Sequence, residues 1–525
     1  MKKTGIFLGF YPGDQLTIHG IGRLLAFIIK GSESSNIAVF YPKWLEKEIE
    51  DLMKEHAIDC HSLEMISTKH IPMGVKLRDF VKKRRSPKKR SLTLLKLENN
   101  FKKLFKIILT NYLSTPFGAQ LILKTLFLFM VCMVATPLIL LPTIVYFIIR
   151  VFKLTTKKTI SLGKSFAFKS PIRILKKAIV GAQGRIYQNV LDNELIRLTT
   201  LINGRKDITS CYIPSMAWPQ IQYIKCRKIL AAPDIVFYDF PTQFSGVGDI
   251  HRRLRESISS SDKIITYSEY VKEQHLIKKS GVDPDKIIVI KHANVDMSEH
   301  LKVPKSTEKF ITIREHAKQI ISNHVNVNHG PSHIFYNADL EDFDCLIYSS
   351  QNRPHKNIFN LIQAVKIANR EYQRNFKLII TADIYQDAFI ADYIRSNNME
   401  NEIIVMHDIP SNLLAAFNCL ASLAVNPTLF EGGFPFTFSE AYSVGTPSIM
   451  SDIPVVRSEI EDNLLKKMML FNPFSPQAIA QKIIWGLENK DQLYYSQKQL
   501  YNKFNNRDWN KVSKQYSDVF KETVR

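Results

Sequence analysis

Two glutamates flank a glycine pair in the carboxyl-terminal half of this 525-residue chain. Glu431 directly precedes Gly432 and Gly433, and Glu440 follows after a short aromatic stretch. Glycines let the backbone approach a ligand closely and turn its N–H groups toward it. Carboxylates beside such a turn accept hydrogen bonds from hydroxyl groups. The segment therefore suits a ligand that carries a sugar and a ribose together, such as a nucleotide sugar.

The glycine pair needs a strand before it and a helix after it. Residues 421–427 are an apolar run closed by Asn426-Pro427, which is typical of a buried strand in a parallel sheet. Residues 438–444 predict a helix that ends at Gly445, and the start of a helix favours phosphate. The alternative is a helix N-terminus whose acidic residues only complement its dipole.

A pair of cations follows another predicted strand, at 345–350. Arg353 and Lys356 lie between this strand and a helical pattern at 359–368. Open parallel sheets bind ligands at the carboxyl ends of their strands, so both cations are placed to meet a ligand. A solvated basic turn is the alternative. Strands continue to alternate with helices, as a doubly wound half requires, at 377–382, 402–407 and 421–427.

These motifs resemble the retaining GT-B glycosyltransferases of family 4, glycosyl transferases group 1, which carry two glutamates in a Glu-x7-Glu motif. The likeness runs through residues 429–457, although eight residues separate the two glutamates here instead of seven. It implies that Glu431 contacts the hydroxyls of the donor sugar and that Glu440 holds the ribose. It also implies that the sugar meets backbone N–H groups of Gly432, Gly433 and Phe434.

The resemblance also assigns the cations. Arg353 and Lys356 would neutralise the donor's diphosphate as it leaves, which is the kind of charge stabilisation that usually dominates catalysis. This class resembles a metal-independent one, so no metal and no cofactor besides the nucleotide-sugar co-substrate is expected. The linker before the second domain contains four histidines, but no cysteine or well-spaced acid accompanies them to complete a zinc site: His316, His324, His329 and His333.

The first residues show the same pattern of a strand, a turn with glycines and a helix. Residues 4–10 predict a strand, and Gly20 and Gly22 open an apolar helix at 24–29. A dehydrogenase fingerprint would need a third glycine, which is absent. In the family that the chain resembles, this loop faces the diphosphate from the other domain. Gly20, Gly22 and Arg23 are therefore expected to bind the donor.

Asp239 is the remaining catalytic candidate. It follows Tyr238 where relatives often carry a His-Asp pair, and the tyrosine leaves a histidine-based role without support. Neighbouring segments look like successive strand ends of the family's acceptor-side domain: 212–218, 235–244, 263–269 and 286–296.

The chain is too long for one core, so two Rossmann-like α/β domains of the GT-B type are predicted, with a basic, apolar helical insertion in the N-terminal one. The predicted parts are an N-terminal acceptor-side domain (1–73 and 190–300), the insertion (74–189), a linker (301–340), a C-terminal nucleotide-sugar domain (341–505) and a C-terminal helix that returns toward the N-terminal domain (506–525).

All of the excess charge lies in the insertion. The whole chain has a net charge of +22, and residues 76–191 alone contain 24 lysines and arginines but only two acids. Within them, residues 125–149 run without a charge, and these 25 residues exceed the roughly 20 needed to span a bilayer. Basic clusters beside an apolar anchor favour anionic lipid over nucleic acid as the partner.

Topology constrains this segment, because the predicted domain has strands on both sides of it. Both ends must then lie in one compartment, and the basic residues at both flanks favour the cytoplasmic face. Pro137 and Pro142 interrupt the apolar run, which favours a re-entrant hairpin. A two-span hairpin that uses residues 104–123 as its first arm and a buried core helix are the alternatives.

The expected function is that of a membrane-associated glycosyltransferase of the hexosyltransferase type, with its catalytic domains in the cytoplasm. Six scattered cysteines and the absence of a secretory signal after Met1 agree with that compartment. The acceptor would be a lipid-linked or membrane-bound glycan in cell-surface polysaccharide synthesis, for example of lipopolysaccharide. Two alternatives remain: a GT-B sugar-nucleotide epimerase, which needs no anchor, and a catalytically inactive membrane scaffold of a glycan assembly complex.

Overall fold

The computed structural model describes residues 2–14, 16, 20–32, 36–59, 63–82, 120, 122–123, 125–126, 171–244, 246–303, 312–329, 333–336 and 340–522. The chain divides into two compact units. The first consists of Met1–Leu16, Ala38–Thr209 and Gln220–Cys226, and the second of Thr17–Ile37, Ser210–Pro219 and Arg227–Arg525. The domain boundaries given above stay a prediction.

The first unit is built on strands and helices, namely β1 (Lys3–Phe7), β2 (Ile37–Tyr41), β3 (Glu64–Ser67), α2 (Glu46–Glu55), α3 (Met73–Lys82) and α6 (Pro171–Asn203). Every residue of β2 is buried, and β2 pairs with β3 so that Val39 lies opposite Met65. In α2, Ile49, Leu52 and Met53 are buried, the spacing of one helix face.

Helix α6 crosses the predicted end of the insertion at residue 189. It has 33 residues and begins at Pro171, where a proline is tolerated because the first helical N–H groups have no partner inside the helix. Its buried residues include Val190, Leu195 and Leu198. The end of the predicted insertion and the following part of the N-terminal domain are therefore one continuous helix.

Further parallel strands are β4 (Ile208–Ile213), whose first two residues belong to the first unit, and β5 (Arg227–Ala231), β6 (Lys263–Thr266) and β7 (Ile287–Val289) of the second unit. The strand order of this seven-stranded sheet is β3-β2-β1-β4-β5-β6-β7. Helix α7 (Val247–Ser259) precedes β6, and a π-helix over Val271–Lys279 follows it.

Helix α1 (Gly20–Lys30) packs against α17 (Trp509–Lys521) within the second unit. Phe27 stacks on Trp509 with ring centroids 4.2 Å apart. A Cβ atom on Gly31 would lie 2.4 Å from the Cβ of Ser513, so only glycine lets the chain pass this close to α17. This packing fixes the helix that carries Arg23.

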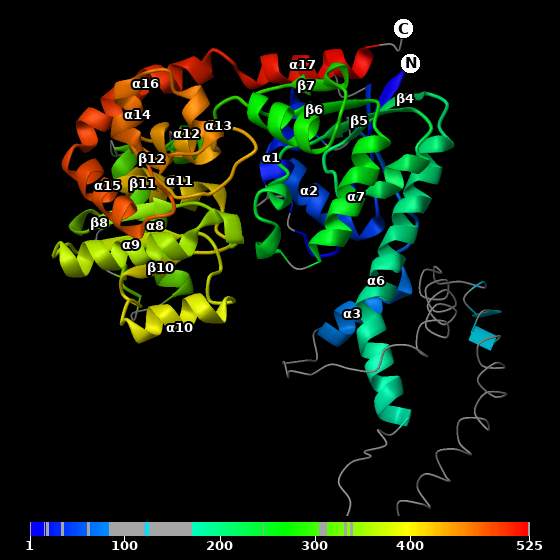
Figure 1. Cartoon of the computed structure of the whole chain (residues 1–525), viewed down its shortest axis with the longest axis horizontal. Coiled ribbons are helices and arrows are strands. Elements are labelled where there is room, and N and C mark those ends of the chain that lie inside the picture. Colours follow the sequence, from blue (N-terminus) through cyan, green and yellow to red (C-terminus); the bar gives the residue numbers. More distant parts are fainter. Residues whose placement is uncertain are drawn as a thin grey trace, which may run out of the picture. The chain divides into compact units, whose positions relative to one another are not determined.

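A second, six-stranded parallel sheet has the order β10-β9-β8-β11-β12-β13 (Figure 1). Its strands are β8 (Asp344–Tyr348), β9 (Phe376–Ile380), β10 (Ile403–Val405), β11 (Leu423–Asn426), β12 (Ser448–Ser451) and β13 (Leu470–Phe471). The order reverses between β8 and β11, and such a switch point is where doubly wound sheets bind ligands.

Alternating side chains of this sheet enter two separate cores. Leu346 and Tyr348 belong to one core, and Cys345 and Ile347 belong to the other. Both faces are therefore covered by helices, which explains why these strands are apolar throughout. The helices are α8 (Ile313–Asn328), α9 (Ile358–Glu371), α10 (Ala388–Ser396), α11 (Ser411–Leu420), α12 (Phe436–Tyr442), α13 (Pro454–Glu459), α14 (Asn463–Met469), α15 (Pro476–Glu488) and α16 (Lys490–Asn505).

The predicted α/β class with two parallel sheets is confirmed. The helix predicted at 438–444 begins two residues earlier, at Phe436, because Pro435 directly before it has an extended backbone and ends the preceding turn. Gly445 lies just beyond this helix with a φ of +98°, which is the left-handed conformation that glycine adopts readily.

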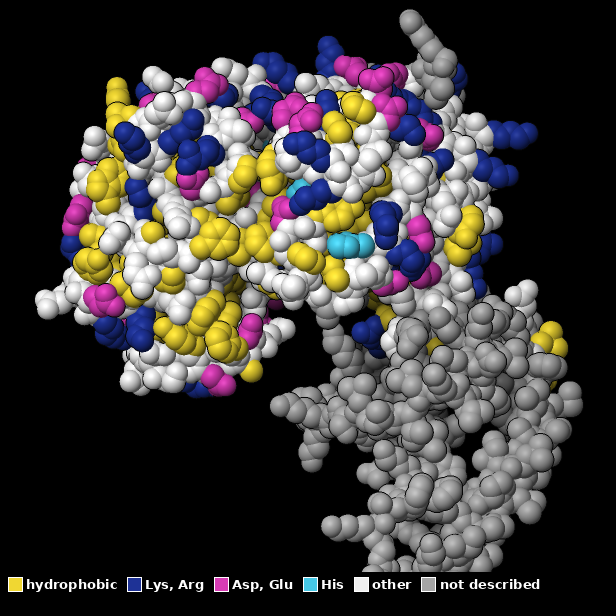
Figure 2. Space-filling view, viewed as in Figure 1, with side chains coloured by type: hydrophobic (Ala, Val, Ile, Leu, Met, Phe, Trp, Pro, Cys, Tyr) yellow, Lys and Arg dark blue, Asp and Glu magenta, His cyan; other side chains and the backbone are white. Residues whose placement is uncertain are grey.

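The apolar run predicted at 125–149 lies outside the described residues except for positions 125 and 126. Among the helices that the structure does describe, none is long and apolar enough to cross a membrane. The described part of the face in Figure 2 shows lysine and arginine side chains interspersed with aspartate and glutamate. This mixture agrees with the near-neutral charge of the chain outside residues 76–191.

Candidate functional site

The turn that follows β8 holds both predicted cations. Pro354–Lys356 form a single 3-10 turn, and Asn357 after it has a φ of +58°. The Asn357 side chain donates hydrogen bonds to the backbone oxygens of Pro427, at 2.9 Å, and Pro473, at 2.8 Å. Because Pro427 directly follows β11, this asparagine fixes the cation turn to the neighbouring strand end.

His355, between the two cations, is buried and fixes the turn a second time. Its backbone oxygen accepts hydrogen bonds from the N–H of Leu429, at 2.8 Å, and from the hydroxyl of Thr428, at 3.3 Å. Burial, with help from Lys356 and Arg353, lowers the pKa of His355 to about 3, so its ring is neutral at ordinary pH. The sequence reasoning did not single out this residue, although it lies inside the Arg353–Lys356 spacing.

Lys356 and Glu431 form an ion pair at the carboxyl ends of β8 and β11. The Lys356 Nζ lies 2.6 Å from the Glu431 Oε1, and the two side chains are 20% and 19% exposed. Partial burial strengthens such a charge-assisted contact, while the remaining exposure leaves it accessible to a ligand. The cation predicted for a diphosphate and the carboxylate predicted for a sugar are therefore neighbours.

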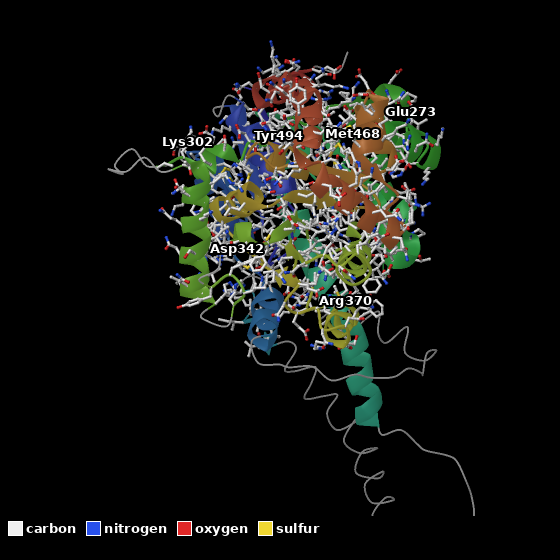
Figure 3. The ribbon with its side chains drawn as sticks, turned by 90° about the vertical axis from the view of Figure 1, so that its left-hand side faces the viewer. Glu273, Lys302, Asp342, Arg370, Met468 and Tyr494 are labelled. Carbon is white, nitrogen blue, oxygen red and sulfur yellow. The ribbon has the colours of Figure 1, made fainter. Side chains whose placement is uncertain are left out.

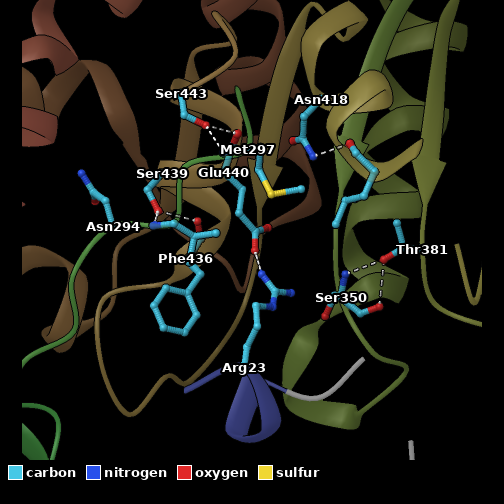
Figure 4. A network of polar contacts seen from close by, with 12 residues as sticks. Arg23, Asn294, Met297, Ser350, Thr381, Asn418, Phe436, Ser439, Glu440 and Ser443 are labelled. Atoms are coloured by element: carbon cyan, nitrogen blue, oxygen red, sulfur yellow. Dashed lines mark hydrogen bonds and ion pairs between the residues drawn. The ribbon is translucent and has the colours of Figure 1, made fainter. Parts of the chain in front are cut away.

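Glu440 pairs with Arg23 of α1, as Figure 4 shows. The Glu440 side chain is only 3% exposed, whereas that of Arg23 is 22% exposed. The flanking serines of α12 anchor the helix: Ser439 Oγ accepts from the N–H of Val295 and Ser443 Oγ from the N–H of Met297, both at 3.0 Å. Glu440 is thus held on a helix with little freedom to move.

Aromatic packing holds α12 from its other side. Tyr442 stacks on Tyr494 of α16, which is labelled in Figure 3, with ring centroids 4.4 Å apart. Phe434, the third residue predicted to face the sugar through its backbone, packs its ring against Phe438 and Phe504 at 5.5 and 4.8 Å. The Phe434 side chain therefore anchors the turn.

The glycine pair lies in close contact with the ends of β5 and β6. A Cβ atom on Gly432 would lie 1.8 Å from the backbone oxygen of Pro233, which no real structure tolerates. A Cβ atom on Gly433 would lie 3.1 Å from the Cβ of Tyr267. The Ser268 hydroxyl donates a 2.7 Å hydrogen bond to the backbone oxygen of Gly432. Glycine is therefore required at 432 by packing, in addition to any ligand.

Asp234, after β5, faces the same turn and was not predicted. Its Cβ would be 3.0 Å from a Cβ atom on Gly432. Burial raises the pKa of Asp234, and Glu431 adds to this effect, while Arg353, Lys356 and His275 oppose it. The carboxyl thus lies within the electrostatic reach of the predicted catalytic cations. Its only signal in the sequence was its position after an apolar strand.

Asp239 is engaged elsewhere in the second unit. Its Oδ2 lies 3.0 Å from the Nε2 of His275, a fully buried residue of the π-helix, and its other oxygen pairs with Lys279. Burial alone would raise the pKa of Asp239, but the hydrogen bonds from His275 and Lys279 outweigh it and hold that pKa below its usual value. A His–Asp pair therefore exists, with the histidine supplied from 36 residues further along the chain.

The predicted donor-binding loop is placed only in part. Gly20 and Gly22 are in the first turn of α1. A Cβ atom added to Gly20 would have no other atom within 4 Å, so packing does not require glycine there. Arg23 is the member of this group that reaches another predicted residue, Glu440. Arg353 is exposed beside Lys356.

Within the described ranges, no group of three histidine, cysteine, aspartate or glutamate side chains is arranged to hold a metal ion. Among the linker histidines, the rings of His324 and His329 are 5.6 Å apart and those of His329 and His333 are 4.7 Å apart. Burial lowers the pKa of His324 and His333, and the neighbouring histidines lower it further.

Residues 334–506 match the model of the family described as Glycosyl transferases group 1. This range includes Arg353, Lys356 and both predicted glutamates, and it spans the whole six-stranded sheet. No protein in the comparison with curated proteins matches the chain.

Solved structures show the fold over the whole chain. A protein from Anabaena, Alr3699/HepE, in complex with UDP and glucose, is 12% identical with a TM-score of 0.55, and the match covers 100% of both chains. The N-terminal domain of trehalose-6-phosphate phosphatase from Candida albicans is 10% identical with a TM-score of 0.54, over 98% of this chain and 96% of that one. The chain therefore has the two-domain GT-B fold, while identities this low show the fold alone.

Proposed function

We propose that the protein transfers a sugar from a nucleotide-sugar donor to a glycan acceptor. The observation that carries this proposal is two ion pairs, Lys356 with Glu431 at the ends of β8 and β11, and Arg23 of α1 with Glu440 of α12. Lys356, Glu431 and Glu440 lie within the residues that match the group 1 glycosyltransferase model. Each pair contains one group suited to phosphate and one suited to hydroxyls. A nucleotide sugar supplies both kinds of partner in one molecule.

Donor binding would exchange these partners. The diphosphate would take over Lys356 and Arg23, with Arg353 as a third cation, and the two carboxylates would turn to the sugar and ribose hydroxyls. The exchange leaves every partly buried charged group hydrogen-bonded, which reduces the cost of its burial. The UDP and glucose of the Anabaena complex make a UDP-sugar the first donor to test.

The reaction breaks the bond between the anomeric carbon of the sugar and the diphosphate oxygen, and forms a bond from that carbon to an acceptor oxygen. The acceptor hydroxyl gives up its proton to the departing diphosphate or to solvent. Cations fixed at the diphosphate stabilise the charge that develops on it. The family resemblance extends the proposal to retention of the anomeric configuration and to catalysis without a metal ion.

The membrane part of the proposal rests on the sequence. The charge-free run at 125–149 and its basic flanks favour a re-entrant anchor in anionic lipid, with the catalytic domains on the cytoplasmic face and a lipid-linked acceptor. Such an anchor would bring the enzyme to an acceptor that cannot leave the bilayer, as in cell-surface polysaccharide synthesis.

The test of the activity incubates membranes that contain the protein with radiolabelled nucleotide sugars and extracts the lipids. Label in the lipid extract supports the proposal, and conversion of the donor to another nucleotide sugar would instead show an epimerase. In the Arg353→Ala and Lys356→Ala variants, each lost cation should reduce transition-state stabilisation by about 2–4 kcal/mol. Arg395→Gln, at an exposed ion pair on α10, is the control. Unchanged kcat/KM in the double variant would remove both cations from the mechanism.

The topology has its own test. Single cysteines are placed at Ser86 and Ser161 in a chain without the six native cysteines, and inside-out and right-side-out vesicles are treated with a membrane-impermeant thiol reagent. Both positions should react in inside-out vesicles only. Labelling of the two positions from opposite faces would show a single crossing and would contradict the re-entrant anchor.

A further inference from the structure

A hollow of about 380 Å³, including space open to solvent, lies near the glycine turn and is lined by none of the three cations assigned to the donor, Arg23, Arg353 and Lys356. Its walls include residues from the chain after β7, from the turn before α12, and from α13 and α16. Those that matter most here are Lys291, His292, Phe436, Glu459, Phe504 and Arg507. We call it the Arg507 pocket.

Arg507 is the unusual member of this pocket. It is partly buried, and its Nε has no hydrogen-bond partner among the described residues. Its guanidinium lies over the ring of Phe504, 5.5 Å from the centroid. Burial lowers the pKa of Arg507, and the Glu459 carboxylate offsets this effect only in part. A partly buried cation without a hydrogen-bonded anion is costly, and an incoming anion would relieve that cost.

Glu459, the carboxylate of the pocket, is already engaged. Its Oε1 lies 2.6 Å from the Nζ of Lys291. With Lys291 and Arg507 opposed by this single acid, the three side chains have a net charge of +1. The net positive charge of the pocket therefore favours binding of an anion. Repulsion from the Glu459 carboxylate would reduce the affinity of that anion.

His292 offers a second polar atom without a partner. Its Nδ1 is buried and has no hydrogen bond among the described residues, and its ring lies between Tyr267 and Phe436, with centroids 4.1 and 5.0 Å away. Burial, with a further contribution from Arg507, lowers the pKa of His292 to about 3. A neutral imidazole can still donate one N–H bond, and the tautomer with its proton on the buried Nδ1 would donate it from there.

We propose that the Arg507 pocket binds a small oxyanion of the phosphate class, with Arg507 Nε and His292 Nδ1 as its donors. A tetrahedral oxyanion has enough acceptors for both donors and for Lys291 together. The aromatic walls lower the local dielectric constant, which strengthens these contacts. None of the three cations assigned to the donor lines this pocket, although Phe434, assigned to the donor through its backbone, does.

Calorimetry of the full chain with inorganic phosphate tests the proposal. Phosphate should bind the Arg353→Ala/Lys356→Ala variant, in which the donor site is weakened, about as well as the wild type. Binding should fall at least about tenfold in Arg507→Gln, the change in affinity that one charged partner typically contributes, and should be unchanged in Arg395→Gln. Equal affinity in wild type and Arg507→Gln, or binding that disappears with the donor-site cations, would overturn the proposal.

A second measurement needs no variant and so cannot be confused with misfolding. Phenylglyoxal modifies arginines, and mass spectrometry of the wild-type protein follows Arg507 and the exposed Arg395 in parallel. Phosphate should slow modification of Arg507 several-fold and leave Arg395 unchanged. A sugar phosphate tested beside inorganic phosphate distinguishes a monoester from the free anion as the ligand, and protection by neither would refute the site.

Discussion

Replacement of Gly432 by alanine tests the geometry of the donor site most sharply. The added Cβ would lie 1.8 Å from the Pro233 oxygen and 2.6 Å from its carbon, and real Cβ atoms essentially never approach another atom closer than 3.0 Å. These neighbours are backbone atoms, which cannot rotate away as a flexible side chain can. The turn must therefore move by more than 1 Å, together with Glu431 beside it.

A displacement of this size has two consequences. Overpacking of this kind typically costs about 1–3 kcal/mol of stability. A misplacement of about 1 Å at a positioning group typically lowers the rate about 100-fold. We therefore expect Gly432→Ala to fold with a lower melting temperature and to lose about two orders of magnitude in kcat/KM for sugar transfer.

The assay combines steady-state transfer kinetics with thermal unfolding. Gly433→Ala is an intermediate case, because its Cβ would contact Tyr267 at 3.1 Å and His292 at 3.2 Å, both through side chains. Gly248→Ala is the matched control, since it lies in α7 with no atom within 4 Å of the new methyl group. If Gly432→Ala were as active and as stable as Gly248→Ala, the packing of the turn on Pro233 would be wrong.

Other predictions separate the roles of single side chains. Glu440→Gln should weaken UDP binding about tenfold or more, whereas Glu431→Gln should lower turnover with UDP still bound. Calorimetry with UDP distinguishes the two variants, and full affinity in Glu440→Gln would contradict the ribose role of Glu440. Asn357→Ala should cost about 2–4 kcal/mol of unfolding free energy, because two carbonyls lose their donor and the left-handed backbone is strained, and Asn357→Gly should recover about 1 kcal/mol of this in a denaturant titration. The pKa of Asp234 is raised in the folded protein, so ionisation of its carboxyl destabilises the folded state above the usual aspartate pKa. Asp234→Asn should therefore be more stable than the wild type at pH 7. This gain in stability should shrink as the pH falls toward about 4, where the unfolded chain also becomes protonated. A gain that is independent of pH would show that Asp234 is not buried in this way.

The sequence by itself predicted the class of fold and the strands that precede the candidate site residues. Apolar runs closed by turn residues are a local signal, and they placed the strands before Arg353 and before Glu431 correctly. Since parallel strands bring their carboxyl ends to one edge, the sequence also predicted that these residues share that edge. The start of α12 was predicted two residues too late, because a turn rich in phenylalanine has no clear periodicity that marks where the helix begins.

The basic and apolar insertion remains a conclusion from the sequence. Its charge and hydropathy are properties of composition, which need no tertiary structure to be recognised. Thiol labelling at positions 86 and 161 tests whether it enters a bilayer.

Tertiary structure alone decided which charges meet. Arg23 and Glu440 are 417 residues apart, and no local pattern predicts their contact. The same holds for the pair of His275 and Asp239. Its two members lie on different elements, so no spacing in the sequence indicates that they are in contact. Burial raises the pKa of Asp234 and removes the space for a side chain at Gly432, and burial is set by segments that are remote in the sequence. Residue type therefore showed which chemistry was available, and packing between distant segments determined which groups are paired, buried or left for a ligand.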